Sequence, residues 1–476
     1  MPHRHQRKAD AGRPASYFSE DTIAAPASSF GGAVGIIRVS GPGAFPSLAR
    51  LASGSSIFER PPRTAVRCYL RSPNGTLLDH AVVLRFVSPE SYTGEDCVEY
   101  HTHGNPLIAR NLVTSLEELG VRRALPGEFS FRAVRNGKLS LSQATGISDL
   151  VSAANETAVQ LALEKLSGQQ NRWIQELGES LRGLALRAES EIDFSEQDFG
   201  ESLLPDLIKE TANIVSKLQR LAGSFKRGSR IQSGVRVAFL GLPNAGKSSL
   251  FNALLGEDRS IVSGIPGTTR DVVGEHVTLS AQGASATFRL EDTAGLRAST
   301  DEVESLGIQR SLRAGQDADL ILFLVDASHP DAISASEKEW VALGLPFEKS
   351  LGVLTKTDLA EPAKGSAPET STIRVKKWVS CSAQTGAGVN ELVQEMVQFS
   401  SHWYQRDPGE FILTQMEHAT AVQNAVQHLE RASAAPEVDL FASDIRQALH
   451  SLSPLIGETV PDDILNAIFS KFCIGK

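Results

Sequence analysis

The sequence predicts a multidomain protein of mixed α/β and α+β class, in which an α/β unit is inserted into a helical domain. Short β-type runs, turns and one helical stretch fill residues 21–125, a pattern typical of an α+β domain. On both sides of residues 235–399, apolar residues recur at the spacings of an amphipathic helix. Between them, apolar β-type runs and a glycine-flanked loop that opens a helix indicate the α/β unit.

We expect the chain to divide into a series of parts that differ in their sequence patterns. These are a disordered basic extension (1–20), an N-terminal domain (21–136), a first helical part (137–233), the α/β unit (234–399) and a second helical part (400–476). Because the helical domain would enclose the α/β unit in the sequence, a ligand-dependent change in that unit can move both ends of the helical domain.

The charge of the chain limits its classes of function. The formal net charge is -9 and the pI is about 5.7, so contact with nucleic acid would need a local basic patch and not a broad basic surface. Residues 1–13 are basic and could form an RNA-contacting arm, but a disordered extension is the favoured interpretation.

Cysteine spacing and apolar runs bear on the cellular location. Cys68, Cys97, Cys381 and Cys473 lack the paired spacing of a disulfide framework or a zinc site. No apolar run approaches membrane-spanning length, and the N-terminus lacks the hydrophobic segment of a secretory signal. We therefore expect a cytoplasmic protein with no membrane span.

The N-terminal domain contains two charged residues in positions that are usually apolar or solvated. β-type runs are expected at 33–39, 65–70, 81–86 and 97–100, and a helix at 106–119. Arg38 and Glu99 lie inside two of these runs. A paired or ligand-facing role is open to both residues, but periodicity alone favours a solvated strand face.

A phosphate-binding motif lies at the start of the α/β unit. Residues 241–248 read GLPNAGKS and match the pattern GxxxxGK[ST] at every fixed position, between a β-type run and a helix. Glycines let successive N–H groups point at phosphate oxygens, Lys247 adds a positive charge, and the Ser248 hydroxyl can bind Mg²⁺. The motif predicts a nucleotide site.

Three further motifs specify the nucleotide. In Asp292-Thr293-Ala294-Gly295, a carboxylate at a strand end can reach Mg²⁺ through water, and a backbone N–H can contact a γ-phosphate. In Thr355-Lys356-Thr357-Asp358, the Asp358 carboxylate can accept hydrogen bonds from guanine N1–H and N2–H₂, a pairing that adenine cannot make. Residues 379–383 resemble a segment whose backbone contacts guanine O6. Together the motifs predict GTP binding.

Other elements can be predicted from apolar spacing and turns. Residues 275–279 and 286–290 flank a glycine-containing turn and predict a hairpin, and residues 320–325 predict a buried strand. Near the C-terminus, a helix that begins near Pro461 would bury Ile464, Leu465, Ile468, Phe469 and Phe472.

Hydrolysis of GTP would need a group that positions water. Leu296 follows the Asp292 motif where Ras-type GTPases carry a glutamine, and an apolar side chain cannot orient water. The downstream acidic cluster that includes Glu304 is equally open to a catalytic role and to a solvated helix start. Thr269, in a flexible segment over 263–271, could complete a Mg²⁺ shell, and neighbouring Arg270 is a weaker candidate for stabilising the transition state.

These motifs resemble those of the MnmE (TrmE) family of tRNA modification GTPases, over residues 21–476. The shared stretches are 35–41, 92–96, 126–129, 241–249, 267–271, 292–297 and 472–476. The C-terminal Cys-Ile-Gly-Lys is the most specific of them, because other GTPases lack it. The resemblance implies a folate-binding N-terminal domain, a discontinuous helical domain, a Ras-like G domain and a homodimer formed through the N-terminal domains.

The resemblance also implies a reaction and a partner. Family members work in a heterotetramer with the FAD-dependent protein MnmG (GidA) on certain tRNAs. They add a carboxymethylaminomethyl or aminomethyl group to C5 of the wobble uridine, position 34. A tetrahydrofolate derivative, 5,10-methylene- or 5-formyl-, supplies the one-carbon unit.

Site residues follow from the same resemblance. It implies folate contacts at Arg38, Glu99, Lys138 and Lys476; Mg²⁺ ligands at Ser248 and Thr269; K⁺ ligands at Asn244, Ser263, Ile265 and Thr268; water positioning by Glu304; and a thiol at Cys473 that acts as nucleophile or general acid. The expected GTP-binding residues are Asn244, Ala245, Gly246, Lys247, Ser248, Ser249, Ser263, Gly264, Ile265, Pro266, Gly267, Thr268, Thr269, Asp292, Thr293, Ala294, Gly295, Thr355, Lys356, Asp358, Ser382, Ala383 and Gln384.

The chain departs from the family pattern at a few positions. Thr355 begins the guanine motif where asparagine is usual, Phe131 replaces a residue that is usually acidic, and Gly146 interrupts an alanine-rich stretch. Threonine keeps a hydrogen-bonding hydroxyl, so we expect guanine specificity to survive. Two other classes of function stay open: a ribosome-assembly GTPase and a scaffold GTPase without folate chemistry.

Overall fold

The computed structural model describes most of the chain. The described residues are 17–52, 56–194, 202–256, 274–291, 312–329, 331–344, 346–360, 373–405, 409–456, 465, 468–470, 472 and 475. The chain divides into two compact units: residues 1–148, 164–179 and 452–476 form unit 1, and residues 149–163 and 180–451 form unit 2.

Unit 1 is built on a six-stranded sheet of order β3-β4-β5-β2-β1-β6. Its strands are β1 Ile23–Pro26, β2 Val34–Ser40, β3 Val66–Arg71, β4 Leu77–Phe86, β5 Cys97–His103 and β6 Arg122–Arg123. All pairs are antiparallel except β1 with β6. The four strands and the helix expected from the sequence of this region are confirmed.

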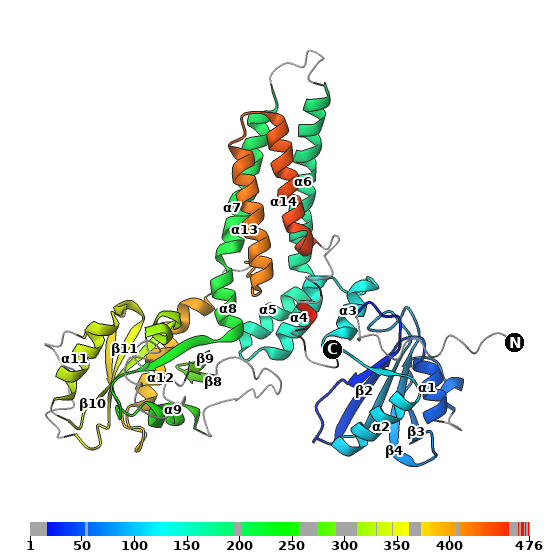
Figure 1. Cartoon of the computed structure of the whole chain (residues 1–476), viewed down its shortest axis with the longest axis horizontal. Helices are drawn as coiled ribbons and strands as arrows, with labels where there is room; N and C mark the ends of the chain where they lie inside the picture. The colour runs from blue at the N-terminus through cyan, green and yellow to red at the C-terminus, as the bar shows by residue number, and fades with distance from the viewer. Residues whose placement is uncertain are drawn as a thin grey trace, which may run out of the picture. The chain divides into compact units, whose positions relative to one another are not determined.

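One face of this sheet carries the core of unit 1. Helices α1 Ala44–Leu51 and α2 Pro106–Glu118 pack against it, and a short 3₁₀ helix, η1 Ser56–Glu59, lies nearby in the chain (Figure 1). Leu48, Leu112 and Leu116 of the helices share a buried cluster with strand residues such as Val83 and Tyr100. Alternate strand residues therefore lie on the opposite face.

An aromatic cluster joins the C-terminal residues to the rest of unit 1. Phe131, in α3 Glu128–Arg135, is buried, and its ring lies 5.3 Å from Tyr17, 5.2 Å from Phe18 and 5.5 Å from Phe469. An acidic residue at position 131 would place an unpaired charge among these rings, so the apolar replacement suits this chain. Ile468, Phe469 and Phe472 are buried as expected, whereas Pro461 and Ile464 lie outside the described residues.

Unit 2 contains a second six-stranded sheet, of order β12-β11-β10-β7-β9-β8. Its strands are β7 Val235–Leu240, β8 Gly274–Ala281, β9 Ala284–Glu291, β10 Leu320–Asp326, β11 Ser350–Thr355 and β12 Lys377–Ser380. Only the edge pair β8–β9 is antiparallel in this sheet. The predicted hairpin is confirmed, and so is the buried strand, since every residue of β10 is buried.

Helices cover both faces of the second sheet. The buried cluster on one face includes residues of α9 Lys247–Leu255 and α12 Val389–Tyr404. The cluster on the other face includes Ile321, Phe323 and Trp340, the last from α11 Ala332–Leu343. A short 3₁₀ helix, η2 Phe347–Lys349, precedes β11. This three-layer arrangement explains why the inner strands read as continuous apolar runs.

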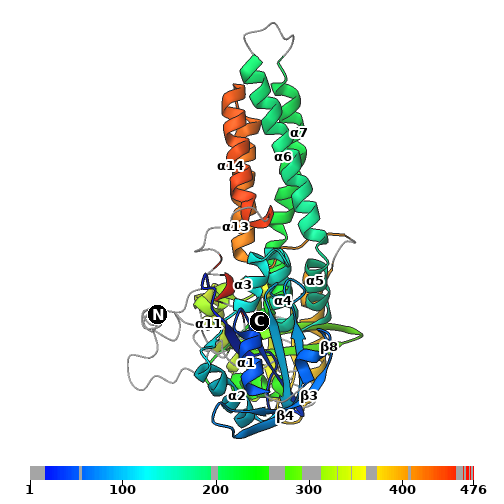
Figure 2. The ribbon, with the colours of Figure 1, turned by 90° about the vertical axis from the view of Figure 1, so that its right-hand side faces the viewer.

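Helices from before and after the second sheet pack together. The remaining helices are α4 Leu141–Ser152, α5 Glu156–Leu166, α6 Gln169–Phe194, α7 Leu204–Gly223, α8 Phe225–Ser233, α13 Met416–Ser433 and α14 Val438–Ile456. Within unit 2, α7 packs along α13, and the ion pairs Arg187–Glu210 and Arg446–Glu189 join α6 to α7 and to α14 (Figures 1 and 2). The α/β sheet is therefore inserted into a discontinuous helical domain, as the sequence predicts.

A polar seam joins the β8–β9 hairpin to the helical segments of unit 2. The Tyr404 hydroxyl accepts a hydrogen bond from Thr287 N at 3.0 Å, and Asn155 Nδ2 donates to Thr287 Oγ1 at 3.1 Å. Thr278 Oγ1 donates to Ala154 O at 3.0 Å. Thr287 is fully buried, so these hydrogen bonds fix the hairpin against the segment between α4 and α5.

None of the described helices combines the length and the apolar character that a bilayer crossing requires.

Candidate nucleotide-binding site

The phosphate loop connects the central strand β7 to helix α9. Gly241 has φ 137°, and a Cβ there would overlap with Leu324 O of the adjacent strand β10. The loop therefore needs glycine at this position. The Lys247 ammonium folds back over the loop and donates to Gly241 O at 2.7 Å and Leu242 O at 2.9 Å. These contacts place a positive charge beside the N-terminus of α9, where a phosphate would bind.

Thr355 ties the guanine motif to the phosphate loop. It ends β11, is 4% exposed, and its hydroxyl donates to Ala245 O at 2.7 Å. Its Cβ and hydroxyl also lie against Gly246, at 3.5 Å from the place where a Cβ of that glycine would stand. The hydroxyl thus satisfies a carbonyl of the loop, so a polar side chain is needed at this position.

Lys356, the next residue of the motif, forms an ion pair with Asp326 at the end of the adjacent strand β10. Lys356 Nζ lies 2.6 Å from Asp326 Oδ2, and Asp326 Oδ1 accepts hydrogen bonds from Ser328 N and Oγ at 3.0 and 2.6 Å. Burial alone would raise the pKa of Asp326, but the bonds from Lys356 and Ser328 hold it below its usual value. Asp326 is therefore a carboxylate at neutral pH.

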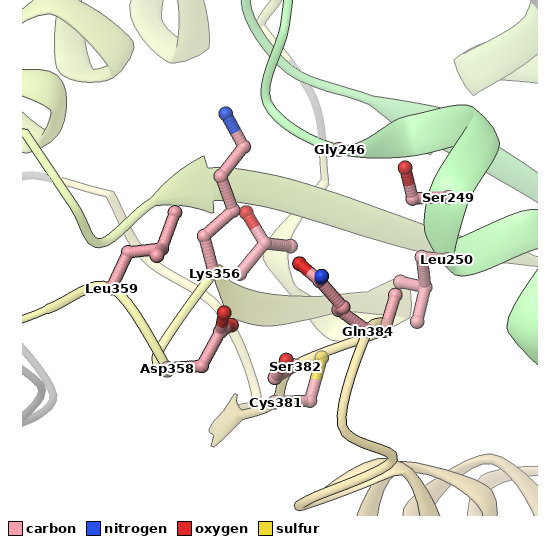
Figure 3. Close-up of a pocket in the computed structure, with 11 residues that line it drawn as sticks. Gly246, Ser249, Leu250, Lys356, Asp358, Leu359, Cys381, Ser382 and Gln384 are labelled. Atoms are coloured by element: carbon pink, nitrogen blue, oxygen red, sulfur yellow. The ribbon is translucent and has the colours of Figure 1, made fainter.

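A cavity of about 300 Å³ lies between these loops. Its lining residues follow β7, β11 and β12 in the chain: Gly246, Ser249, Leu250, Thr355, Lys356, Asp358, Leu359, Cys381, Ser382, Ala383 and Gln384. Figure 3 shows Asp358 and Gln384 extending toward the same space, while the Lys356 ammonium points away from Asp358. Carboxyl ends of neighbouring parallel strands meet at one edge of a sheet, which explains the convergence.

The structure brings together one part of the predicted nucleotide site. Asn244 and Ser248 are exposed on the phosphate loop and the first turn of α9. The residues at the other predicted positions lie outside the described residues: Ser263, Gly264, Ile265, Pro266, Gly267, Thr268, Thr269, Arg270, Asp292, Thr293, Ala294, Gly295 and Glu304.

Some residues of the site escaped the sequence analysis. Leu250 and Cys381 supply an apolar part of the cavity wall, and burial raises the pKa of the Cys381 thiol to about 11, so it is protonated at neutral pH. Asp326 was also missed. Its position as the last residue of a fully apolar strand beside the guanine motif is the signal that could have found it.

A second polar site lies on the sheet of unit 1. Arg38 and Glu99 are register partners on β2 and β5, and the Arg38 guanidinium lies 2.9 Å from the Glu99 carboxylate. The guanidinium carbon lies 5.0 Å from the Tyr92 ring centre and 5.7 Å from that of Phe129. The two side chains are 21% and 18% exposed, so the structure favours the paired role over a fully solvated strand face.

A buried ion-pair network supports this second site. Arg132 is 2% exposed and pairs with Asp21, Glu95 and Glu128 at 3.0–3.1 Å. Arg122 pairs with Asp21 and Glu128 at 2.7 Å. Arg132 and Glu128 are buried, and an unpaired buried charge is costly, so these ion pairs fix α3, which carries Phe129, against the segment that carries Glu95 and Tyr92.

The remaining residues of the predicted folate site are only partly described. Lys138 is exposed, and its stem lies against Gly94. Cys473 and Lys476 lie outside the described residues. Gly475, between them, has φ 98°, and a Cβ there would overlap with Pro26 O at the end of β1. The backbone of Gly475 therefore lies against Pro26. Pro26 follows Ala25 in the chain, and Ala25 is the register partner of Arg38.

The first site and its sheet define a class of protein. A mostly parallel sheet with a phosphate loop after its central strand and a guanine motif at the end of β11 is a Ras-like P-loop nucleotide-binding domain. Two family descriptions match the chain: "MnmE helical domain" over residues 141–473 and "GTP-binding protein TrmE N-terminus" over residues 22–138. The chain belongs to the MnmE (TrmE) family.

Individual relatives are similar over nearly the whole chain. "tRNA modification GTPase MnmE" of Chromobacterium violaceum is 37% identical over 464 residues, covering 96% of this chain and 99% of that protein. The protein of the same name from Protochlamydia amoebophila is 36% identical, covering 97% and 98%. Among solved structures, the G domain of the T. maritima FeoB iron transporter is 26% identical, covers 35% of this chain and 98% of that chain, and has a TM-score of 0.24.

The contact between Thr355 and the phosphate loop predicts the outcome of a substitution. Thr355→Val keeps the shape of the side chain but leaves the Ala245 carbonyl without its hydrogen bond, which costs roughly 1–3 kcal/mol. We expect GDP affinity, measured by calorimetry, to fall about tenfold or more. Thr355→Ser keeps the hydroxyl and is the matched control. Equal GDP affinities for the valine variant and the unsubstituted protein would contradict the role assigned to Thr355.

Proposed function

We propose that the chain is a GTP hydrolase that acts in tRNA modification. With the FAD-dependent partner MnmG (GidA), it adds a carboxymethylaminomethyl or aminomethyl group to C5 of the wobble uridine of certain tRNAs. A 5,10-methylene- or 5-formyl-tetrahydrofolate supplies the one-carbon unit. The observation that carries the proposal is similarity over 96% of this chain to proteins named tRNA modification GTPase MnmE. The Arg38–Glu99 site favours it over a scaffold GTPase without folate chemistry.

Guanine selection follows from the cavity. The Asp358 carboxylate presents two acceptors to the space that it shares with Gln384, and guanine offers N1–H and N2–H₂ donors to such a group. Adenine places an acceptor at N1 and would leave the carboxylate unpaired. A bound adenine would shield this exposed carboxylate from water without offering it a donor, so we expect discrimination against ATP.

The phosphate loop offers ligands for cations. The Ser248 hydroxyl is exposed at the N-terminus of α9, where it can bind Mg²⁺ together with Thr269. Bound Mg²⁺ neutralises charge on the β- and γ-phosphates. The Asn244 side chain is exposed on the loop and supplies a neutral oxygen for K⁺, with Ser263, Ile265 and Thr268 as its companions. Glu304 would orient the attacking water, and Arg270 is a secondary candidate for stabilising charge.

The cation proposal predicts a salt-specific rate. GTP hydrolysis should be much faster in KCl than in NaCl of equal ionic strength, because a K⁺ site is too large for dehydrated Na⁺. Asn244→Ala should abolish the difference between the two salts, and Glu304→Ala should lower kcat by about a hundredfold or more with little change in GTP binding. Release of phosphate provides the measurement. Equal rates in the two salts would refute the K⁺ site.

The second site has the chemistry of a folate pocket. The Glu99 carboxylate can accept hydrogen bonds from the amino edge of a pterin, and the rings of Tyr92 and Phe129 hold Arg38 in place beside it. The exposed Lys138, and Lys476 of the tail, can contact the carboxylates of the folate glutamate. The buried network around Arg132 keeps the aromatic rings in position.

An open sheet face supports the proposed homodimer. Val34, Tyr69 and Val82 lie on the face of the unit 1 sheet opposite α1 and α2, and they are 57%, 57% and 36% exposed. Tyr69 and Val82 are diagonal neighbours on β3 and β4, Val34 lies beyond β5, and exposed apolar side chains on a sheet favour association. We therefore assign this face to pairing of two N-terminal domains.

The C-terminal tail predicts a separation of the two activities. In cells that lack this protein, the C5 modification of the wobble uridine should be lost, and expression of the unsubstituted chain should restore it. Cys473→Ser should not restore it, and neither should Gly475→Ala, because the added Cβ would overlap with Pro26 O and displace the tail. Mass spectrometry of tRNA nucleosides gives the readout.

Paired controls make this test specific. Both variants should hydrolyse GTP at the normal rate, since the tail belongs to unit 1 and the phosphate loop to unit 2. Gly183→Ala is the matched glycine control, because a Cβ at Gly183 meets no atom within 4 Å. Full modification in cells that express the Cys473 variant would show that the Cys473 thiol is not needed for the reaction.

A further inference from the structure

We propose that Asp326 is a positioning residue for guanine recognition, which holds the Lys356 ammonium away from Asp358. This inference rests on the proposed GTP binding and adds a residue to it. Asp326 is not among the residues that line the cavity, but it pairs with Lys356, which does line it, so it acts through Lys356.

The backbone places Asp326 beside the guanine motif. Asp326 on β10 and Thr355 on β11 are register partners, and Ala327 N donates to Thr355 O at 2.9 Å. Asp326 is 9% exposed and ends a strand whose other residues are all apolar and buried. A carboxylate at this position needs specific partners, because burial of an unpaired charge is unfavourable.

Both oxygens of the carboxylate have partners with good geometry. Oδ2 lies 2.6 Å from Lys356 Nζ, and Oδ1 accepts from the backbone and the hydroxyl of Ser328. Ser328 thus fixes the orientation of the carboxylate, and the carboxylate fixes the lysine. The pairing joins the ends of two adjacent strands at the edge where the cavity lies.

The conformation of Lys356 makes its anchor important. Lys356 has φ 56°, in the left-handed region that residues with a Cβ rarely adopt. This turn directs the chain from β11 into the cavity wall, where Asp358 follows two residues later. The Lys356 side chain lines the cavity, but its ammonium points out of it (Figure 3).

A released lysine would compete with guanine. Lys356 and Asp358 are separated by one residue, and an ammonium without the Asp326 carboxylate can pair with the Asp358 carboxylate instead. That pair would occupy the acceptors needed by guanine N1–H and N2–H₂. Asp326 therefore keeps Asp358 available, and its loss should reduce both the affinity for guanine and the preference for a base that carries the 2-amino group.

Binding of GDP and of IDP, which lacks the 2-amino group, tests the inference on the full chain. Asp326→Asn should lower the affinity for GDP by about tenfold and should reduce the preference for GDP over IDP. Lys356→Met keeps the aliphatic stem but removes the ammonium. Added to Asp326→Asn, it should recover GDP affinity relative to Asp326→Asn alone, because no ammonium is left to occupy Asp358.

The outcomes separate this inference from simpler explanations. A purely structural role for Asp326 would leave the double variant as weak as Asp326→Asn, and that result would overturn the proposal, as would unchanged GDP binding by Asp326→Asn. Circular dichroism shows whether Asp326→Asn folds. If it does not fold, Ser328→Ala is the second variant, which should loosen the Asp326 carboxylate and lower GDP affinity to a smaller extent. Unchanged GDP affinity in Ser328→Ala would overturn the proposal. Failure of the unsubstituted chain to bind GDP in preference to ADP would instead overturn the proposed GTP function itself.

Discussion

The hydrogen bond from the Thr355 hydroxyl to Ala245 O joins the two halves of the nucleotide site. It links the end of β11 to the phosphate loop after β7, across β10, which lies between these strands in the sheet. The close approach of Gly241 to Leu324 O joins the start of the same loop to β10 through the backbone. Because parallel strands bring their carboxyl ends to one edge, a single sheet can position phosphate-binding and base-binding groups together. Asp358, Lys356 and Gln384 depend on that alignment.

The motifs of the described part of this site can be recognised in the sequence because their requirements are local. Gly241, Gly246 and Lys247 are set by backbone conformation and by phosphate chemistry, so they appear as a motif with fixed spacing. The β8–β9 hairpin and β10 follow from alternation and from continuous apolar character. The contact that Thr355 makes was not predictable in this form, because its acceptor lies 110 residues earlier in the chain.

In unit 1, the contacts that could not be predicted from the sequence are ion pairs between residues far apart in the chain. Periodicity alone favoured a solvated face for Arg38 and Glu99 over a paired role, but strand register makes them direct neighbours, and aromatic rings lie against Arg38. The network of Arg132 with Asp21 joins residues 111 positions apart, and no local pattern signals it. The polar seam of Thr287, Asn155 and Tyr404 is similar, since it joins the hairpin to segments on both sides of the inserted sheet. It gives the hairpin a fixed contact with the helical segments of unit 2.

We propose that Asp358, held in place by this framework, recognises guanine. Binding of GTP and XTP to the unsubstituted chain and to Asp358→Asn tests it most directly. A carboxamide donor faces the 2-amino donor of guanine but suits the oxygen at C2 of xanthine. We expect the variant to lose affinity for GTP and to prefer XTP. Unchanged preference for GTP in Asp358→Asn would contradict it.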